Sequence, residues 1–218
     1  MKKNTITIDG PAAAGKTTVS RLISNELGFV YVDTGAIYRA LALYMKKKGI
    51  DFQNEKIVVE NLNPKIRPSG EKIFLNNEDV SNEIRTEDIS MGASIISSYG
   101  KVRDYLLDIQ RNVGEEFDCV FEGRDMGTKV FPMAQIKFYL DAALETRVKR
   151  RFNQLIEKRE NPVFEKVYQN LEKRDIQDMT RIHSPLKPAM DAILIDSTLM
   201  DAICVKDKMI EIIKQKIK

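Results

Sequence analysis

The segment from Thr5 to Thr18 constrains the fold of this chain more than any other stretch. Its first half alternates β-branched apolar residues with polar ones, and its middle consists of glycine, proline and alanine. Its last residues open a longer segment with apolar residues at helical spacing. Such alternation is typical of a strand, and such spacing is typical of an amphipathic helix. The segment therefore predicts a strand, a tight loop and a helix in immediate succession.

The loop within this segment matches the pattern G-x-x-x-x-G-K-[ST]. In this pattern the glycines let the backbone curl so that N–H groups point inward, the lysine reaches the β- and γ-phosphates, and the Ser/Thr hydroxyl can ligate Mg²⁺. A tight turn that only needs glycine would not require the Lys-Thr pair that follows it. The loop therefore predicts a nucleoside triphosphate site formed by Gly10, Pro11, Ala12, Ala13, Ala14, Gly15, Lys16, Thr17 and Thr18, with Thr17 as the metal ligand.

Length and composition limit the size of the core and the kinds of partner that the chain can have. A chain of 218 residues with 43% hydrophobic and 31% charged residues can bury one substantial core and still carry a small insertion. The net charge of +3 favours neither a nucleic-acid nor a membrane partner, and no apolar run approaches membrane length. Cys119 and Cys204 stand in apolar surroundings without paired spacing, so we expect buried free thiols in a cytoplasmic protein.

Further apolar runs indicate the rest of the fold. Four more strands are expected near residues 29–32, 119–122, 136–140 and 192–195, separated by helical patterns. Together with the first strand they predict an α/β fold, with a five-stranded parallel core sheet covered on both faces. From about residue 50 to 85 prolines interrupt the pattern, and alternation before a turn candidate at 76–79 predicts an inserted subdomain with a hairpin.

Charged residues gather where the expected strands end. Arg39 and the pair Arg124-Asp125 follow two of these strands, and ligands of open α/β sheets bind at that edge. Arg147 shares a helical face with Arg150 and Arg151, which is either a solvated surface or a lid over the phosphates. A second such face could be a surface ion-pair ladder or part of the site; it carries Arg174, Asp178 and Arg181. His183 is expected to face solvent or to cap, rather than to act as a base.

Several blocks together resemble the bacterial cytidylate kinases of the nucleoside monophosphate kinase superfamily. The resemblance runs through the phosphate loop, Asp33-Thr34-Gly35-Ala36-Ile37-Tyr38-Arg39, Gly123-Arg124-Asp125-Met126-Gly127-Thr128, the 174–181 face and Pro185-Leu186-Lys187-Pro188-Ala189. The second and third blocks are far more specific than the phosphate loop. There are two departures: Met133 stands where the family often has Asp, and Thr34 where many members have Ser.

The resemblance implies the residues that would bind CMP or dCMP. They are Arg39, Arg124 and Arg181 at the phosphate, Arg174 and Asp178 at the sugar, Ser94, Arg103 and Asp125 at the cytosine, and Thr34 in the pocket wall. A carboxylate can accept a hydrogen bond from the exocyclic amino group of cytosine but is repelled by the oxygen that uracil has there. We therefore expect Asp125 to select against UMP.

The implied reaction is in-line transfer of the γ-phosphoryl group of ATP to CMP or dCMP, with Mg²⁺ bound together with ATP. Its catalytic residues would be Lys16, Arg150 and Arg151, while Arg147 would contact ATP from a lid of about residues 145–165. An ionised acceptor phosphate needs no strong general base, so positioning and charge neutralisation suffice. The resemblance also implies one kinase domain over residues 1–218, with its monophosphate-binding insertion at 50–85, acting as a monomer.

Two other functions remain to be weighed. A P-loop switch protein would use its nucleotide state to control a partner, but a GTPase needs the strings N-K-x-D and D-x-x-G, and the chain contains neither. A kinase for another small acceptor is the nearer alternative. It would be favoured if a metabolite other than CMP protected the protein against heat.

Overall fold

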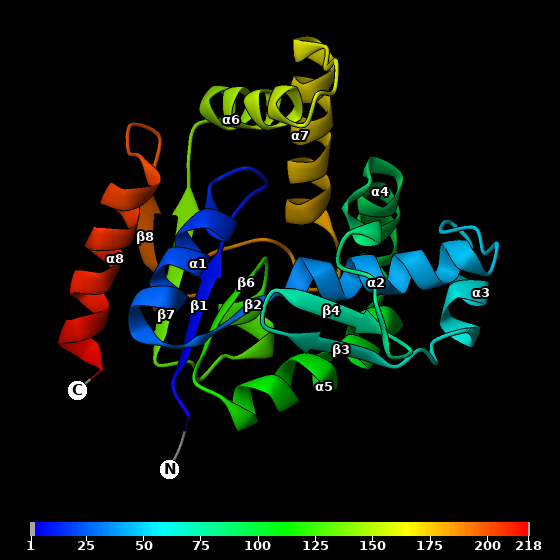
Figure 1. Ribbon diagram of the computed structural model, residues 1–218, viewed down its shortest axis with the longest axis horizontal. Coiled ribbons are helices and arrows are strands. Elements are labelled where there is room, and N and C mark those ends of the chain that lie inside the picture. Colours follow the sequence, from blue (N-terminus) through cyan, green and yellow to red (C-terminus); the bar gives the residue numbers. More distant parts are fainter. Residues whose placement is uncertain (1–2, 218) are drawn as a thin grey trace.

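The computed structural model describes residues 3–217, and a five-stranded sheet lies at its centre (Figure 1). Its strands are β1 (Thr5–Asp9), β2 (Val30–Asp33), β6 (Cys119–Gly123), β7 (Ile136–Asp141) and β8 (Ile193–Asp196). They run in the order β2-β6-β1-β7-β8, and each neighbouring pair is parallel. The predicted α/β class and the predicted five-stranded parallel sheet are confirmed.

Helices cover both faces of this sheet. The helices α1 (Lys16–Leu27) and α8 (Ala202–Lys216) share one apolar cluster with β1, β6, β7 and β8. On the other face, residues of α5 (Gly100–Glu116) and of a short π-helical turn, η2 (Met126–Val130), pack against β2 and β6. Cys119 is buried in this second cluster as expected. Cys204 is exposed on α8, so the prediction of a second buried thiol is wrong.

A second hydrophobic core surrounds α2 (Thr34–Lys47). Asp33 caps this helix by accepting a hydrogen bond from the Ala36 amide at 3.0 Å. The cluster joins α2 to α3 (Glu55–Glu60), η1 (Glu83–Arg85), α4 (Glu87–Ile96) and the hairpin strands. Because α2 belongs to this core, the segment that follows it lies to one side of the main sheet (Figure 1).

The inserted segment carries a small antiparallel sheet in the order β3-β4-β5. Its strands are β3 (Ile66–Ser69), β4 (Lys72–Leu75) and β5 (Glu78–Asp79). The expected hairpin is present, but the expected turn at 76–79 is shorter. Only Asn76 and Asn77 have positive φ, at 50° and 74°, while Glu78 and Asp79 pair with β4. Asparagine tolerates this left-handed conformation better than most residues, which explains why the turn lies there.

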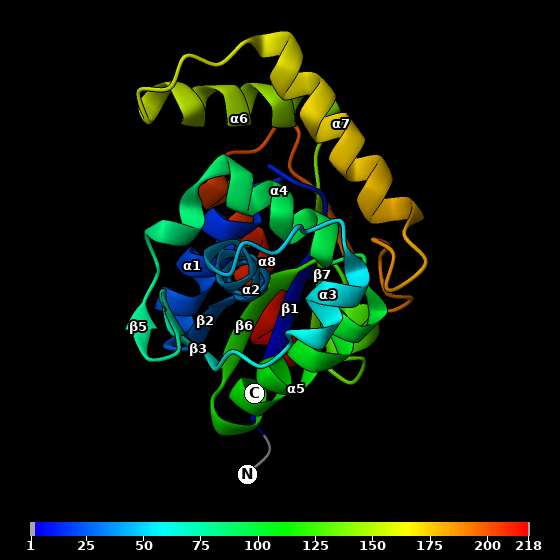
Figure 2. The same cartoon turned by 90° about the vertical axis from the view of Figure 1, so that its right-hand side faces the viewer.

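Two further helices cross the carboxyl edge of the main sheet. They are α6 (Leu144–Glu157) and α7 (Phe164–Thr180), which pack on each other and form the upper part of the molecule in Figures 1 and 2. Val148 of α6 and Val167 and Leu171 of α7 are buried together with Ala12 of the phosphate loop. This packing attaches both helices to the loop and brings the C-terminal end of α7 toward the edge of the sheet.

Candidate active site

The phosphate loop joins β1 to α1 through three residues with positive φ. Gly10, Ala13 and Gly15 have φ values of 149°, 60° and 96°, and Gly15 is the N-cap of α1. At Gly10 a Cβ atom would lie 2.0 Å from the backbone oxygen of Leu140, so only glycine fits there. The loop therefore directs the positive end of the α1 dipole at the edge of the sheet, as expected for an anion site.

Lys16 lies at the base of this loop, and its side chain is buried. Its ammonium group donates to the Pro11 carbonyl oxygen at 2.6 Å. Burial and the neighbouring Arg124 guanidinium lower the pKa of Lys16 to about 7. The negative charge of a bound triphosphate would favour the protonated form of Lys16.

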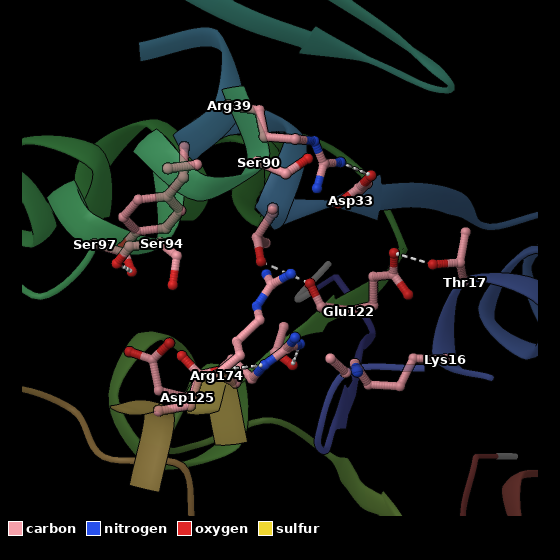
Figure 3. A pocket seen from close by; sticks show the side chains of 18 of the residues that line it. Lys16, Thr17, Asp33, Arg39, Ser90, Ser94, Ser97, Glu122, Asp125 and Arg174 are labelled. Atoms are coloured by element: carbon pink, nitrogen blue, oxygen red, sulfur yellow. Dashed lines mark hydrogen bonds and ion pairs between the residues drawn. The ribbon is translucent and has the colours of Figure 1, made fainter. Parts of the chain in front are cut away.

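A cavity of about 230 Å³ opens at the carboxyl ends of β1, β2 and β6 (Figure 3). Lys16 and Thr17 line it on the side of the phosphate loop. All nine residues predicted for the monophosphate site line the same cavity: Thr34, Arg39, Ser94, Arg103, Arg124, Asp125, Arg174, Asp178 and Arg181. They come from α2, α4, α5, α7 with the residue that follows it, and the loop after β6, so the fold collects residues that are far apart in the sequence.

Arginines and carboxylates are interleaved around this cavity. Nε of Arg124 donates to Oδ2 of Asp178 at 2.9 Å, and Arg181 lies 3.6 Å from the other oxygen of Asp178. Arg103 forms a buried ion pair with Asp125. The second face predicted from spacing is therefore part of the cavity wall and not a surface ladder. These pairs hold each guanidinium plane in place before any ligand binds.

Some arginine nitrogens in this cluster are buried but have no hydrogen-bond partner among residues 3–217. They are Nε of Arg39, Arg103 and Arg174 and Nη2 of Arg181. Burial and the nearby Arg124 lower the pKa of Arg174 to about 10. A buried donor without a partner costs free energy, and a cation beside other cations costs more. An anionic ligand such as a phosphate group would accept hydrogen bonds from these donors and would also offset the repulsion between the cations.

Two carboxylates in the cavity wall were not predicted as site residues. Asp33 accepts from Nη2 of Arg39 at 2.7 Å. Glu122 pairs with Asp33 in strand register and accepts from the Thr17 hydroxyl at 2.9 Å. Burial and the adjacent Asp33 raise the pKa of Glu122. The one available signal was their position, because each is a charged residue at the end, or next to the end, of an otherwise apolar strand.

The other unpredicted polar side chains of the wall belong to Tyr38, Arg85, Ser90 and Ser97. Arg85 comes from η1 in the inserted segment and lies 3.4 Å from Asp33. Ser97 accepts a hydrogen bond from Arg103 at its backbone oxygen, at 2.9 Å. Ser90, Ser97 and Arg85 lie in polar stretches of the sequence that contain no motif, so no pattern singles them out.

Two of the three predicted lid arginines have structural partners. Arg147 is buried, pairs with Asp175 and donates to the Ala12 carbonyl oxygen at 3.2 Å. Arg150 donates to the backbone oxygens of Ser197 at 2.6 Å and Met200 at 3.1 Å. Neither lines the cavity, because these bonds hold both side chains against the back of the phosphate loop and the β8–α8 connection.

Arg151, the third predicted lid arginine, is half-buried and does not line the cavity either, and its charge contributes to lowering the pKa of Arg174. His183 is exposed in the loop after α7, beside Gly100. Met133 is 80% exposed, so this departure from the family pattern lies on the surface, away from the cavity.

The oxygen atoms at the phosphate-loop end of the cavity suit Mg²⁺. This ion prefers hard oxygen ligands and usually takes one or two from protein, the rest coming from phosphate and water. The Thr17 hydroxyl and the Glu122 carboxylate supply that number side by side. Within residues 3–217 no group of three histidine, cysteine or acidic side chains is placed to hold a metal by itself. The residues present therefore fit a metal that arrives with a nucleotide.

None of the helices in the described part of the chain combines the length and apolar character required to cross a membrane. Solved structures with the same fold include a gluconokinase from Sinorhizobium meliloti (11% identity, 98% of this chain and 93% of that chain, TM-score 0.52). A shikimate kinase from Bacteroides thetaiotaomicron is similar at 11% identity over 97% of this chain and 98% of that chain, with a TM-score of 0.50. At such identities these similarities establish the fold only.

Sequence comparison is more specific. The chain is 40% identical to the cytidylate kinase of Caldicellulosiruptor bescii (100% of this chain, 99% of the relative) and 42% identical to that of Thermosipho melanesiensis (98% of each). It is 37% identical to the cytidylate kinase of Bacillus subtilis, over 99% of this chain and 98% of the relative. The model of the cytidylate kinase family matches residues 6–215. This chain therefore belongs to the cytidylate kinase family.

Proposed function

We propose that this protein transfers the γ-phosphoryl group of ATP to CMP or dCMP, giving ADP and CDP or dCDP. The observation that carries the proposal is the single cavity in which the phosphate-loop residues Lys16 and Thr17 face all nine residues expected to bind a cytidine monophosphate. ATP would enter along the loop and the monophosphate from the side of α2, α4 and α7. Their phosphates would then meet between the two groups of residues.

In this proposal the arginines bind the acceptor phosphate and neutralise it. Arg39, Arg124 and Arg181 would each use donors on a rigid guanidinium fork, which matches phosphate geometry. Arg174 and Asp178 would hold the sugar. Because an ionised phosphate oxygen is already a nucleophile, no protein base is required and catalysis rests on alignment and charge.

Asp125 would read the base. Its carboxylate is buried and paired with Arg103, which leaves acceptor capacity on its oxygens. Cytosine offers an amino donor to such an acceptor, whereas uracil offers an oxygen. Ser94 would add a contact from α4. The pair Arg103–Asp125 therefore supports selection of cytidine over uridine monophosphate.

At the other end, Lys16 and the loop amides would bind the triphosphate, and Thr17 and Glu122 would hold Mg²⁺. When bound, the ion would neutralise negative charge on the reacting phosphates. Arg151 is the lid residue best placed to add a further positive charge. Arg150 would first have to leave Ser197 and Met200, so its predicted catalytic role requires movement of α6.

We propose a monomer as the active form, because the phosphate loop and the proposed monophosphate site are both formed by residues that one chain supplies. We place the reaction in the cytoplasm because ATP is its phosphoryl donor. A kinase for an acceptor without an amino donor is disfavoured, because such an acceptor would offer no donor to the oxygen of Asp125 that the Arg103 ion pair leaves available.

A coupled ADP-release assay with ATP and each common nucleoside monophosphate tests the function. We expect turnover with CMP and dCMP, and a kcat/KM for UMP lower by a factor of about 10² to 10⁴. In Asp125→Asn the preference for CMP over UMP should shrink, while Asp108→Asn, an exposed carboxylate on the same helix as Arg103, should keep it. Rapid turnover of a purine monophosphate but not of CMP would contradict the proposal.

A further inference from the structure

Tyr31 is a buried tyrosine whose hydroxyl group faces the metal end of the site from the edge strand of the sheet. It lies on β2 and is 6% exposed. Its hydroxyl donates to Oε1 of Glu122 at 2.7 Å. The same Oε1 atom accepts the Thr17 hydroxyl at 2.9 Å. Three elements, β2, β6 and α1, thus converge on one carboxylate oxygen.

The second oxygen of Glu122 is different. Oε2 is buried and has no hydrogen-bond partner within the described residues, yet Glu122 is part of the cavity wall. Figure 3 shows Glu122 joined to Thr17 beside Lys16 at the phosphate-loop side of the cavity. A buried carboxylate oxygen without a donor is costly. The side chain is therefore held in an orientation in which one oxygen is bonded and the other can accept a ligand.

The hydrogen bond from Thr17 determines what its own oxygen can do. A threonine hydroxyl has one proton and two lone pairs. With the proton donated to Glu122, the lone pairs remain for a cation, and the donation also makes the oxygen a better ligand. If the carboxylate turned away, the Thr17 proton would have to find another acceptor, such as a phosphate oxygen. The Glu122 orientation therefore determines the direction of the Thr17 proton, and with it the direction of the lone pairs that can face a metal.

Tyr31 is the only other donor that the described residues supply to this carboxylate. We propose that Tyr31 is a positioning residue for the metal: its hydroxyl orients Glu122, which in turn orients the Thr17 hydroxyl toward the Mg²⁺ bound with the nucleotide. This inference rests on the proposed function. The ring of Tyr31 also packs below the Arg21 guanidinium, 5.4 Å from the ring centre. Phenylalanine would keep that packing and remove only the hydroxyl.

The test is the affinity of Tyr31→Phe for Mn²⁺ in the presence of ADP, measured by electron paramagnetic resonance without any acceptor. We expect Mn²⁺ to bind about tenfold more weakly, since groups that orient metal ligands commonly contribute factors of ten to a hundred. Affinity for ADP in the presence of EDTA should not change. In turnover, the Mg²⁺ concentration needed for half-maximal rate should rise while the KM for CMP stays constant.

Tyr44→Phe is the matched control, because its hydroxyl bonds to Asn63 at an exposed site away from the cavity. It should bind Mn²⁺ as the unmodified protein does. Glu122→Gln should weaken Mn²⁺ binding, and adding Tyr31→Phe to it should cause no further loss, because both changes act through one carboxylate.

Unchanged Mn²⁺ binding in Tyr31→Phe or in Glu122→Gln would overturn the inference. An equal loss of metal-free ADP binding would also overturn it, since it would indicate general damage to the site. The function is judged separately: if the unmodified protein binds Mn²⁺ with ADP but does not phosphorylate CMP, the proposed acceptor is wrong, whereas the role of Tyr31 is decided by the binding data.

Discussion

Among the single residues, the arginines of the cavity offer buried donors that an anion can satisfy. Arg181 is the clearest case, because its side chain is 5% exposed and its Nη2 has no hydrogen-bond partner in the described chain. In Arg181→Ala a charge-assisted contact to the acceptor phosphate would be lost, which commonly costs about 1.5–3 kcal/mol. We expect the KM for CMP to rise about ten- to a hundredfold, and the KM for ATP to change much less.

Steady-state kinetics with each substrate varied in turn measure this difference. Arg67→Ala is a suitable control, because Arg67 is exposed and stacks on Phe74 in the inserted sheet. A larger effect on ATP than on CMP would place Arg181 at the donor side.

Asp9 predicts a pH dependence of stability. Its carboxyl is buried at the end of β1 and accepts the amides of Met126 and Gly127 at 2.9 and 2.8 Å. Burial raises the pKa of Asp9 from 3.8 to about 6. Because the folded state favours the protonated form, the stabilising contribution of this group is complete below pH 4 and is lost as the pH rises through about 6.

The comparison with Asp9→Asn isolates this contribution, since asparagine does not titrate. We expect the difference in free energy of unfolding between the unmodified protein and the variant to fall by on the order of 2–3 kcal/mol between pH 4 and pH 7. Denaturant unfolding at several pH values measures it. A difference that stays constant over this range would show that Asp9 titrates alike in both states.

The residues that sequence reasoning found and missed differ in their surroundings. Arg39 and Arg124 lie in short blocks of unusual composition after strands, and Arg181 closes a charged helical block, so these residues belong to recognisable motifs. Asp33 ends an apolar strand and Glu122 is the last residue but one of another, and a charged residue is normal at the boundary of a strand. Only register places these two side by side, and register is a property of the folded sheet.

At the scale of elements, the core strands were predictable because strands of a covered parallel sheet are apolar almost throughout. The inserted hairpin was predictable from alternation. The residues of β5, Glu78 and Asp79, fall in the predicted turn because they have no apolar pattern. The lid helices were foreseen by charge, yet the direction of Arg147 and Arg150 depends on packing of α6 against the phosphate loop. The spacing of residues on a helix predicts which side chains share a face, but it does not predict which element packs against that face.

Alanine substitution should destabilise the protein more at Gly10 in the phosphate loop than at Gly70 between β3 and β4. In Gly10→Ala the new Cβ would meet the Leu140 backbone oxygen at 2.0 Å, while Gly70→Ala meets nothing within 4 Å and suffers only from its φ of 59°. We expect Gly10→Ala to lose at least about 3 kcal/mol of stability and Gly70→Ala only about 1 kcal/mol. Urea unfolding compares them. Equal losses would mean that the loop can move away from β7.

In the molecule as a whole, three parts of the fold meet at the cavity: the main sheet, the core around α2, and the α6–α7 pair. The sheet supplies the phosphate loop, the core around α2 supplies Arg39 and Arg85, and the α6–α7 pair supplies Arg174 and Asp178. A ligand that touches all three parts would hold them together. This arrangement explains why no single segment of the sequence contains the site, and why the resemblance of several blocks was more informative than the phosphate loop alone.

In the proposed reaction two nucleotides bind with their phosphates facing each other, one on the phosphate loop and one among the arginines. A crystal structure with CMP and a non-hydrolysable ATP analogue tests this arrangement. We expect the CMP phosphate within hydrogen-bond distance of Arg39, Arg124 and Arg181, and the cytosine amino group at Asp125. Density for CMP at any other place, with these side chains free of ligand, would contradict it.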